Sequence, residues 1–304
     1  MLRKNKTLLI VAGPTAVGKT DLCINLAKKF NTSIISADSR QFYKEINIGT
    51  AKPSKEQLAE VPHYFINTLS IHQDYDVGKF EKEVLELLDS LFLSNDLVIA
   101  TGGSGLYLDA ITKGFDTMPP VDKSVRESLN ELFQKEGLMA LQDKLRVLDP
   151  AYYDTVDIHN PRRLIRALEV CLSTGQPYSS FRKRNESPRP FRILKIALER
   201  DREELYDRID QRMDLMIAEG LFEEARTLYP YRSHNALQTV GYKEIFAHLD
   251  GEYDQEEAIR LLKRNSRRYA KRQMTWFRKD EDYHWFHPSQ TEEIIAFISK
   301  TINA

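Results

Sequence analysis

The sequence predicts an α/β protein with a parallel sheet core, a helical insertion domain and a helical C-terminal region. Near the N-terminus, apolar runs at 7–12 and 33–37 flank an amphipathic helical pattern, which together form a strand–helix–strand unit. Two further apolar runs, at 97–100 and 193–198, are expected to be strands of the same sheet. The long segment between these last two runs has a helical pattern, so it is predicted to interrupt the sheet as an insertion.

Three helices of the core are predicted from apolar residues that recur every three or four positions. These positions are Leu22, Leu26 and Phe30 in the first helix, Phe80, Val84, Leu87, Leu88 and Leu91 in the second, and Leu205, Ile209, Met213 and Ile217 in the third. A turn near Gly220 follows, and then a long basic helix that is expected to end near Phe277.

Proline-rich turns delimit the insertion. Met118-Pro119-Pro120 precedes it and Ser187-Pro188-Arg189-Pro190 follows it. We therefore predict a core formed by residues 1–117 and 190–304, with a helical insertion at 118–189.

Composition limits the class of protein. With 304 residues, of which 41% are hydrophobic, the chain can bury a substantial core. The net charge of -1 hides a stretch at 260–279 that holds nine Lys or Arg and no acid. Cys23 and Cys171 lack the close spacing of a zinc or disulfide site, which favours a cytoplasmic protein. No apolar run approaches membrane-spanning length, so no membrane association is expected.

A phosphate-binding motif follows the first strand. The P-loop pattern is matched by eight consecutive residues, Gly13, Pro14, Thr15, Ala16, Val17, Gly18, Lys19 and Thr20. Its glycines allow backbone amides to point at phosphate oxygens, Lys19 neutralises a terminal phosphate, and the Thr20 hydroxyl is expected to hold Mg²⁺. The motif lies between a strand and a helix, so the predicted fold is a P-loop NTPase-like parallel sheet core.

The P-loop predicts a phosphate ligand but leaves the reaction open. A motor or helicase normally has a metal-binding Asp at the end of a neighbouring strand, whereas here the strand at 97–100 ends in Thr101-Gly102-Gly103-Ser104. The basic runs are also longer than the arginine-rich lid of a small-molecule kinase requires.

Motifs along nearly the whole chain are more specific. They are Asp38-Ser39-Arg40-Gln41 with Tyr43, Ile48-Gly49-Thr50-Ala51-Lys52-Pro53, Gly102-Gly103-Ser104-Gly105-Leu106-Tyr107, His159-Asn160-Pro161-Arg162-Arg163, Arg166-Ala167-Leu168-Glu169, Val240-Gly241-Tyr242-Lys243-Glu244, and Lys271-Arg272-Gln273 with Thr275-Trp276-Phe277-Arg278. With these motifs in this order, the chain resembles the bacterial tRNA dimethylallyltransferases of the tRNA isopentenyltransferase family. One departure is Ser104, where the family usually has Thr, and the hydroxyl is retained.

The resemblance implies transfer of a dimethylallyl group from dimethylallyl diphosphate to N6 of adenosine 37 in the anticodon loop of tRNA. It implies three catalytic residues, Asp38, Ser104 and Arg212. Asp38 accepts the proton of the adenine amine, which is a weak nucleophile, and Arg212 stabilises the departing diphosphate. The resemblance also implies that the insertion at 118–189 clasps the tRNA. Asp38 could instead be an ordinary strand-end acid or an indirect metal holder. Arg212 and Arg208, four positions apart, could simply form a solvated helix face.

Basic and aromatic residues, taken with the resemblance, predict the RNA contacts. Ser104 and Arg126 are implied by the resemblance alone. The full set is Asp38, Ser39, Arg40, Gln41, Ser104, Arg126, Arg162, Arg163, Leu164, Ile165, Arg166, Thr239, Val240, Gly241, Tyr242, Lys243, Glu244, Lys271, Arg272, Gln273, Met274, Thr275, Trp276, Phe277 and Arg278. The tract at 263–278 could alternatively be a solvated face over an apolar stripe.

Two other functions stay open at this stage. One is a small-molecule enzyme, either a nucleotide kinase or a transferase that prenylates free adenine nucleotides. The other is an RNA-binding protein that uses its P-loop as a nucleotide switch. We expect a monomeric enzyme with Mg²⁺ as cofactor and tRNA as partner.

Overall fold

The computed structural model describes residues 6–116, 118–182 and 188–302. It divides into two compact units. The core unit comprises Met1–Lys113 and Pro188–Ala304, and the helical unit comprises Gly114–Ser187. Each unit is described by itself below.

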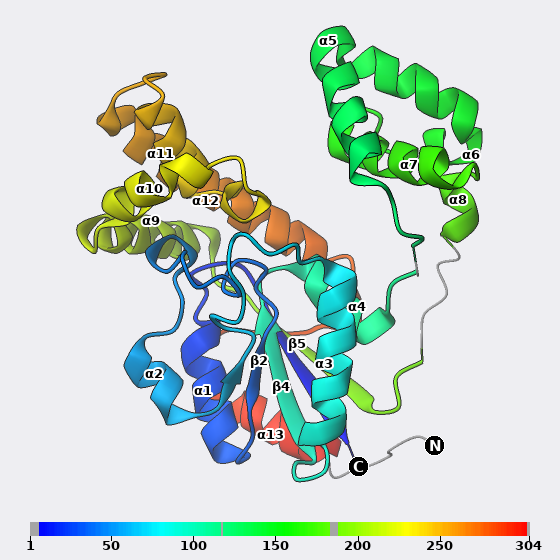
Figure 1. Cartoon of the computed structure of the whole chain (residues 1–304). Helices are drawn as coiled ribbons and strands as arrows, with labels where there is room; N and C mark the ends of the chain where they lie inside the picture. Colours follow the sequence, from blue (N-terminus) through cyan, green and yellow to red (C-terminus); the bar gives the residue numbers. More distant parts are fainter. Residues whose placement is uncertain (1–5, 117, 183–187, 303–304) are drawn as a thin grey trace. The chain divides into compact units, whose positions relative to one another are not determined.

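A sheet of six parallel strands forms the centre of the core unit, in the order β3-β2-β4-β1-β5-β6 (Figure 1). The strands are β1 Thr7–Ala12, β2 Ile34–Ser36, β3 His63–Tyr64, β4 Leu97–Gly102, β5 Arg192–Leu198 and β6 His284–Phe286. The four strands expected from apolar runs are present. The short outer strands β3 and β6 were not predicted, because two or three partly exposed residues give no apolar run.

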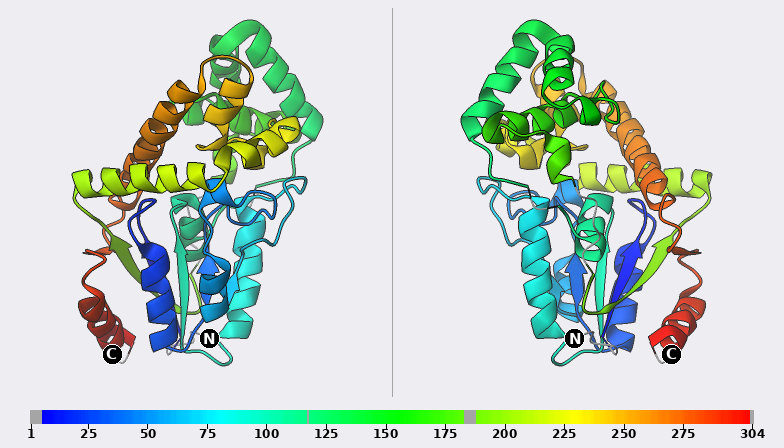
Figure 2. Two further views of the ribbon diagram at one scale, coloured as in Figure 1. Left: turned by 90° about the vertical axis from the view of Figure 1, so that its left-hand side faces the viewer. Right: turned by 90° about the vertical axis from the view of Figure 1, so that its right-hand side faces the viewer.

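Helices cover both faces of the sheet, as Figure 2 shows. Successive residues of β1 alternate between the two faces: Leu8 and Ile10 pack in one core cluster, and Leu9 and Val11 pack in the other. The first cluster includes residues of α3 Val77–Leu91 and α4 Gly105–Lys113, and the second includes α1 Lys19–Lys29 and α13 Thr291–Ile302. Burial on both faces explains why the strands read as continuous apolar runs.

Four helices of the core unit follow β5 and gather beyond the carboxyl ends of the strands (Figure 1). They are α9 Arg202–Ala218, α10 Leu221–Leu228, α11 Tyr242–Leu249 and α12 Gln255–Phe277. The long basic helix thus ends at Phe277 as predicted. Two short segments, α2 Lys55–Glu60 and the 3-10 helix η1 Ile48–Thr50, lie between β2 and β3.

The helical unit has its own apolar core. It contains α5 Lys123–Leu148, α6 Pro150–Tyr153, α7 Pro161–Thr174 and α8 Tyr178–Phe181. Leu141 and Leu145 of α5 pack with Leu164 and Leu168 of α7, and all four are fully buried. The Asn160 side chain accepts a hydrogen bond from the Arg163 amide and caps α7, whose first residue is a proline.

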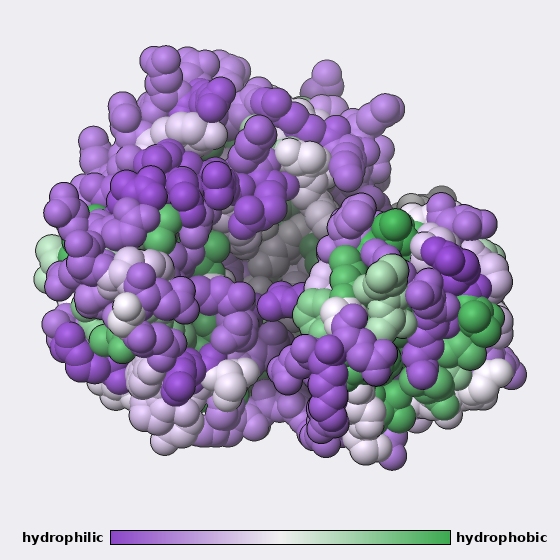
Figure 3. Space-filling view, turned by 90° about the horizontal axis from the view of Figure 1, so that it is seen from above, coloured by the Kyte–Doolittle hydropathy of each residue, from purple (hydrophilic) through white to green (hydrophobic). Residues whose placement is uncertain are grey.

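The surface seen in Figure 3 is largely hydrophilic. Among the described residues, no helix is long and apolar enough to cross a membrane.

Candidate functional site

The P-loop connects β1 to α1 and depends on two glycines in left-handed backbone conformations. Gly13 has a φ of 148° and Gly18 a φ of 111°. A Cβ atom at Gly13 would lie 2.9 Å from the Leu198 carbonyl oxygen, so a larger residue would clash with β5. Thr20 follows in the first turn of α1. The loop therefore has the compact turn and helix N-terminus that suit a bound phosphate.

Lys19 lies against the P-loop backbone. Its Nζ atom donates hydrogen bonds to the carbonyl oxygens of Gly13 and Pro14, at 2.9 and 2.7 Å. Desolvation lowers the pKa of Lys19 to about 8; nearby Asp38 counteracts this shift and Arg212 adds to it. Burial thus leaves a cation whose charge is poorly compensated, and an anionic ligand would stabilise it.

Asp38 lies just beyond the carboxyl end of β2. Its Oδ1 atom accepts a hydrogen bond from the Arg40 amide at 3.0 Å, which holds the carboxylate in a local turn. Its charge interacts with those of Lys19 and Arg212. The structure thus brings together the predicted base, the P-loop lysine and the candidate arginine, as expected for strand ends of a parallel sheet.

Arg212 and Arg208 of α9 differ in a way that their spacing could not reveal. Arg212 donates hydrogen bonds to Thr15 Oγ1 at 3.4 Å and to the Ala51 carbonyl oxygen at 3.2 Å. Burial lowers the pKa of Arg212, and Asp38 opposes that shift. Arg208 is exposed, and its Nε atom donates to the Ala16 carbonyl oxygen. Arg212 is therefore the desolvated cation of the pair.

Ser104 lies between β4 and α4, close to Asp38 in space. The Ser39 amide donates to Ser104 Oγ at 3.2 Å, and Ser104 Oγ donates to Ser39 Oγ at 3.3 Å. Tyr269 of α12 is hydrogen bonded to Ser104, and burial raises the pKa of its phenol to about 12. In the sequence Tyr269 lies within the basic tract at 263–278, and no local signal shows that α12 crosses this site.

Gln273 joins α12 to two loops of the sheet. Its Oε1 atom accepts from the Thr15 amide and its Nε2 atom donates to the Gly103 carbonyl oxygen, both at 2.9 Å. A Cβ atom at Gly103 would lie 2.1 Å from Nε2. Gln273 is buried and connects the P-loop to the loop after β4.

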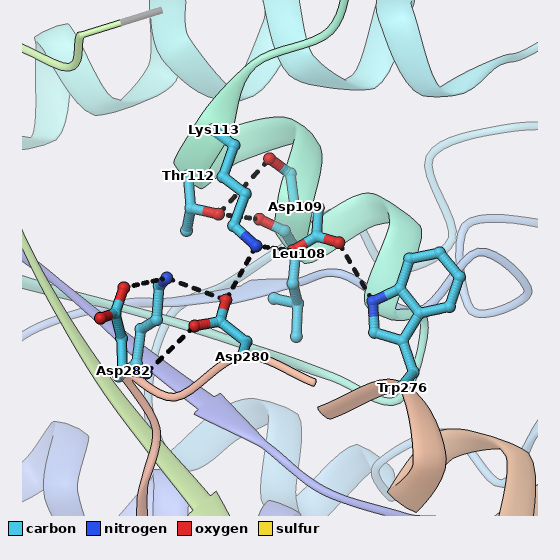
Figure 4. Close-up of polar contacts among 8 residues, drawn as sticks. Leu108, Asp109, Thr112, Lys113, Trp276, Asp280 and Asp282 are labelled. Carbon is cyan, nitrogen blue, oxygen red and sulfur yellow. Dashed lines mark hydrogen bonds and ion pairs between the residues drawn. The ribbon is translucent and has the colours of Figure 1, made fainter. Parts of the chain in front are cut away.

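Trp276 lies about one turn after Gln273 on α12, and 40% of its surface is exposed. Its indole N–H donates to Asp109 Oδ2 at 3.1 Å (Figure 4), and a Cβ atom at Gly105 would lie 2.3 Å from the ring. The ring is thus fixed next to the loop that carries Ser104.

A chain of ion pairs lies next to the Trp276 ring and its partner Asp109 (Figure 4). Lys113 contacts Asp109 at 3.4 Å and Asp280 at 2.9 Å. Asp280 also pairs at 3.0 Å with Lys195, a buried residue of β5. The C-terminal end of α12 is therefore tied to both α4 and the sheet, which gives Trp276 a rigid base.

Known proteins match this chain over almost its whole length. A family model described as IPP transferase matches residues 41–280. The tRNA dimethylallyltransferase 1 of Phocaeicola vulgatus is 53% identical over 292 residues, covering 96% of this chain and 97% of the relative. The protein of the same name from Bacteroides fragilis is 52% identical, covering 98% and 99%. The chain belongs to the IPP transferase family.

Solved structures agree with this assignment. A full-length tRNA isopentenylpyrophosphate transferase from Bacillus halodurans has a TM-score of 0.72 and 38% identity, covering 98% of this chain and 97% of that one. A eukaryotic dimethylallyltransferase acting on tRNA has a TM-score of 0.78 and 27% identity, covering 97% and 80%. The predicted P-loop NTPase-like fold and the predicted family are both confirmed.

The predicted RNA contacts of this IPP transferase family member include inward-facing, exposed and partly buried residues. The partly buried ones are Asp38, Ser39, Arg40, Gln41, Ser104, Arg166, Thr239, Val240 and Met274. The inward-facing side chains are Leu164, Ile165, Tyr242, Glu244, Gln273 and Phe277. They face apolar cores or satisfy backbone groups. The exposed side chains include Arg126, Arg162, Arg163, Lys243, Lys271, Arg272, Thr275, Trp276 and Arg278. Along α7 and α12, buried and exposed residues alternate because each helix turns one face to the protein and the other to solvent.

A buried acid organises the arginines of the helical unit. Glu169 of α7 is only 1% exposed and forms ion pairs with Arg126 and with Arg166, the latter at 3.4 Å. The side chains of Arg126 and Arg166 are 57% and 39% exposed. Glu169 therefore fixes two guanidinium groups whose outer edges remain accessible to solvent.

A cavity of about 590 Å³ in the core unit lies between α9, α12 and the loop after β6. Its lining includes Arg202, Tyr206, Lys271 and Trp285. Arg200, also on its wall, donates to the Val17 carbonyl oxygen, so the cavity adjoins the outer side of the P-loop. Two acids, Glu199 and Asp201, also line it, so the cavity combines both signs of charge with aromatic rings.

Proposed function

We propose that this protein transfers a dimethylallyl group from dimethylallyl diphosphate to N6 of adenosine 37 in the anticodon loop of tRNA and releases diphosphate. The observation that carries the proposal is the meeting of Asp38, Lys19 and Arg212 beside the P-loop. Relatives that share about half of its residues over nearly the full length are named tRNA dimethylallyltransferases. Such a site provides cations for a leaving diphosphate and a carboxylate for an incoming amine.

The cations would act on the leaving group. When the bond between the allylic carbon and its oxygen breaks, negative charge grows on the diphosphate. Lys19 and Arg212 are both desolvated, so their attraction to that growing charge is stronger than it would be in water. Stabilisation that increases as the bond breaks lowers the barrier.

Asp38 would act on the nucleophile. The exocyclic amine of adenine is weakly nucleophilic because its lone pair is delocalised into the ring. As the new carbon–nitrogen bond forms, the amine loses a proton, and we assign the Asp38 carboxylate as the acceptor. The hydroxyl of Ser104, hydrogen bonded to Ser39, would contact the RNA next to this carboxylate.

Mg²⁺ is the cofactor we propose. The described residues contain no group of three or more His, Cys, Asp or Glu that could hold a metal ion. In phosphate sites Mg²⁺ uses one or two protein oxygens and takes its remaining ligands from phosphate and water. Thr20 would supply a hydroxyl oxygen. When bound, the ion supplies further positive charge to the diphosphate.

The exposed basic residues would attract the RNA. Arg126, Arg162, Arg163 and Arg166 of the helical unit offer charge to the phosphate backbone. In the core unit, the fixed ring of Trp276 offers a surface on which an unpaired base can stack. The anticodon loop is unpaired, so its target base can leave the stack at small cost.

The state of the two cysteines is relevant to the cellular location of the protein. Cys23 and Cys171 are both free and buried, which supports our proposal of a cytoplasmic enzyme. We propose that it acts as a monomer.

The test is a transfer assay with radiolabelled dimethylallyl diphosphate and unmodified tRNA. The nucleosides are identified after complete digestion of the RNA, and a tRNA with guanosine at position 37 is the matched control. We expect prenylated adenosine from the first tRNA and none from the second. Preference for free AMP, or label in the control tRNA, would refute the proposal.

A further inference from the structure

The carboxylate of Glu224 lies outside the reaction centre. It binds the backbone of the loop at 47–51, which extends to Arg212 in the reaction centre. Glu224 of α10 accepts hydrogen bonds from the amides of Asn47, Ile48 and Gly49, at 2.9, 3.0 and 2.9 Å. It also accepts one from the Tyr242 hydroxyl at 2.5 Å. These amides begin the 3-10 helix η1, so the negative charge caps a helical N-terminus.

Tyr242 fixes this arrangement from the other side. Its ring is fully buried, and a Cβ atom at Gly49 would lie 2.5 Å from the ring carbon that carries the hydroxyl. Only glycine allows so close an approach. The loop is therefore clamped between a carboxylate and an aromatic ring that come from two different helices, α10 and α11.

The clamped loop ends at Ala51, whose carbonyl oxygen accepts the hydrogen bond from Arg212 at 3.2 Å. Ala51 has a φ of 47°, a left-handed conformation that costs energy for any residue except glycine. Its amide donates to the Ile48 carbonyl oxygen at 2.9 Å, inside the clamped segment. The direction of the Ala51 carbonyl, and hence the position of the Arg212 guanidinium, depends on how the loop is held.

We propose that Glu224, assisted by Tyr242, is a positioning residue for the transfer reaction: it holds residues 47–51 in the conformation that directs Arg212 at the diphosphate. The inference rests on the proposed function, because it assigns Arg212 its task. A positioning role and a purely stabilising role for Glu224 make different predictions for a variant that lacks Arg212. If Glu224 acts through Arg212, its removal has little further effect on turnover once Arg212 is gone.

The experiment is a double-mutant cycle on the full-length protein. Turnover and the inhibition constant of inorganic diphosphate are measured for the parent, Glu224→Gln, Arg212→Ala and the double variant. Glu223→Gln, which removes an exposed carboxylate from the adjacent position, is the matched control. Tyr242→Phe keeps the buried ring and removes only the hydroxyl, so it provides a milder change if Glu224→Gln does not fold.

We expect Glu224→Gln to lower kcat about tenfold and Tyr242→Phe about threefold, since small displacements of a charged group near the reacting atoms reduce the rate strongly. Both should weaken diphosphate inhibition and leave tRNA affinity within about twofold, and the control should match the parent. In the Arg212→Ala background, either change should alter kcat by less than about twofold.

Equal effects in the two backgrounds, or unchanged turnover in both single variants, would overturn the inference. Such a result leaves the proposed function intact, because the parent still forms prenylated adenosine. Failure of the proposed function would instead appear as no transfer by the parent.

Discussion

Arg212 of the core unit and Arg166 of the helical unit both lie on helices near a carboxylate, but water reaches them differently. Arg212 and its neighbour Asp38 are both partly buried, and burial lowers the pKa of Arg212. In the helical unit, the acid Glu169 is 1% exposed and Arg166 is 39% exposed. The first arrangement leaves a cation that lacks hydration and suits a small, highly charged anion. The second anchors cations whose outer edges can meet a large polyanion.

We therefore propose that the core site determines the rate of transfer and that the arginines of the helical unit contribute affinity for RNA. Substitutions in the two regions should therefore affect different kinetic constants.

Removing the proposed base should have the largest effect. We expect Asp38→Ala to lower kcat by at least about 100-fold, because the amine loses its proton acceptor. Affinity for tRNA should stay within about tenfold. Single-turnover transfer and a filter-binding assay measure the two quantities, and equal rates for variant and parent would remove Asp38 from the mechanism.

Removing the desolvated arginine should have the next largest effect. Arg212→Ala is expected to lower kcat about 50-fold, since Lys19 and the P-loop amides continue to stabilise the diphosphate. The matched control is Arg208→Ala, four residues earlier on α9 and exposed. We predict a much smaller loss for this control, because Arg208 is exposed and contacts only the Ala16 carbonyl oxygen of the P-loop. Similar losses in the two variants would contradict the distinction between them.

Neutralising the helical unit should act on tRNA binding. Replacing Arg162, Arg163 and Arg166 with Gln is expected to raise KM for tRNA about tenfold at neutral pH and about 0.15 M salt, with kcat nearly unchanged. The dependence of affinity on salt concentration should also become shallower. Lys135→Gln, on α5 of the same unit, is the control for a general loss of charge. A fall in kcat with unchanged KM would break the division between the two regions.

The smallest predicted effect concerns pH. Because burial lowers the pKa of Lys19 to about 8, the ligand-free protein loses this charge as pH rises through that value. A bound diphosphate favours the charged form, so binding takes up a proton above pH 8 and weakens as pH increases. We expect KM for dimethylallyl diphosphate to rise about fourfold between pH ~7 and ~8.5. Lys19→Arg, which stays protonated, should remove this dependence; an unchanged profile would contradict the assignment.

The sequence was most informative where a feature is local. The strands β1, β2, β4 and β5 are apolar runs, and the P-loop is one contiguous motif, so both could be predicted. The long basic helix was also predicted, but the face that each of its residues presents was not. Gln273 and Trp276 lie three positions apart in one motif, yet the first is buried against the P-loop and the second is exposed.

Contacts between distant segments could not be predicted. The motif at 48–53 and the motif at 240–244 were both recognised, but nothing in either shows that Tyr242 packs on Gly49 or that Glu224 binds both. Likewise, spacing alone could not distinguish Arg212 from Arg208, because their burial depends on how α9 crosses the P-loop. Tertiary packing determines both properties.

The central claim is that the P-loop holds a departing prenyl diphosphate rather than a nucleotide that is hydrolysed. The most direct test measures, in one reaction with dimethylallyl diphosphate, ATP and unmodified tRNA, the diphosphate released, the phosphate released and the prenylated adenosine formed. We predict one diphosphate for each prenylated adenosine and no phosphate from ATP. Phosphate release from ATP without any prenylated nucleoside would contradict the account.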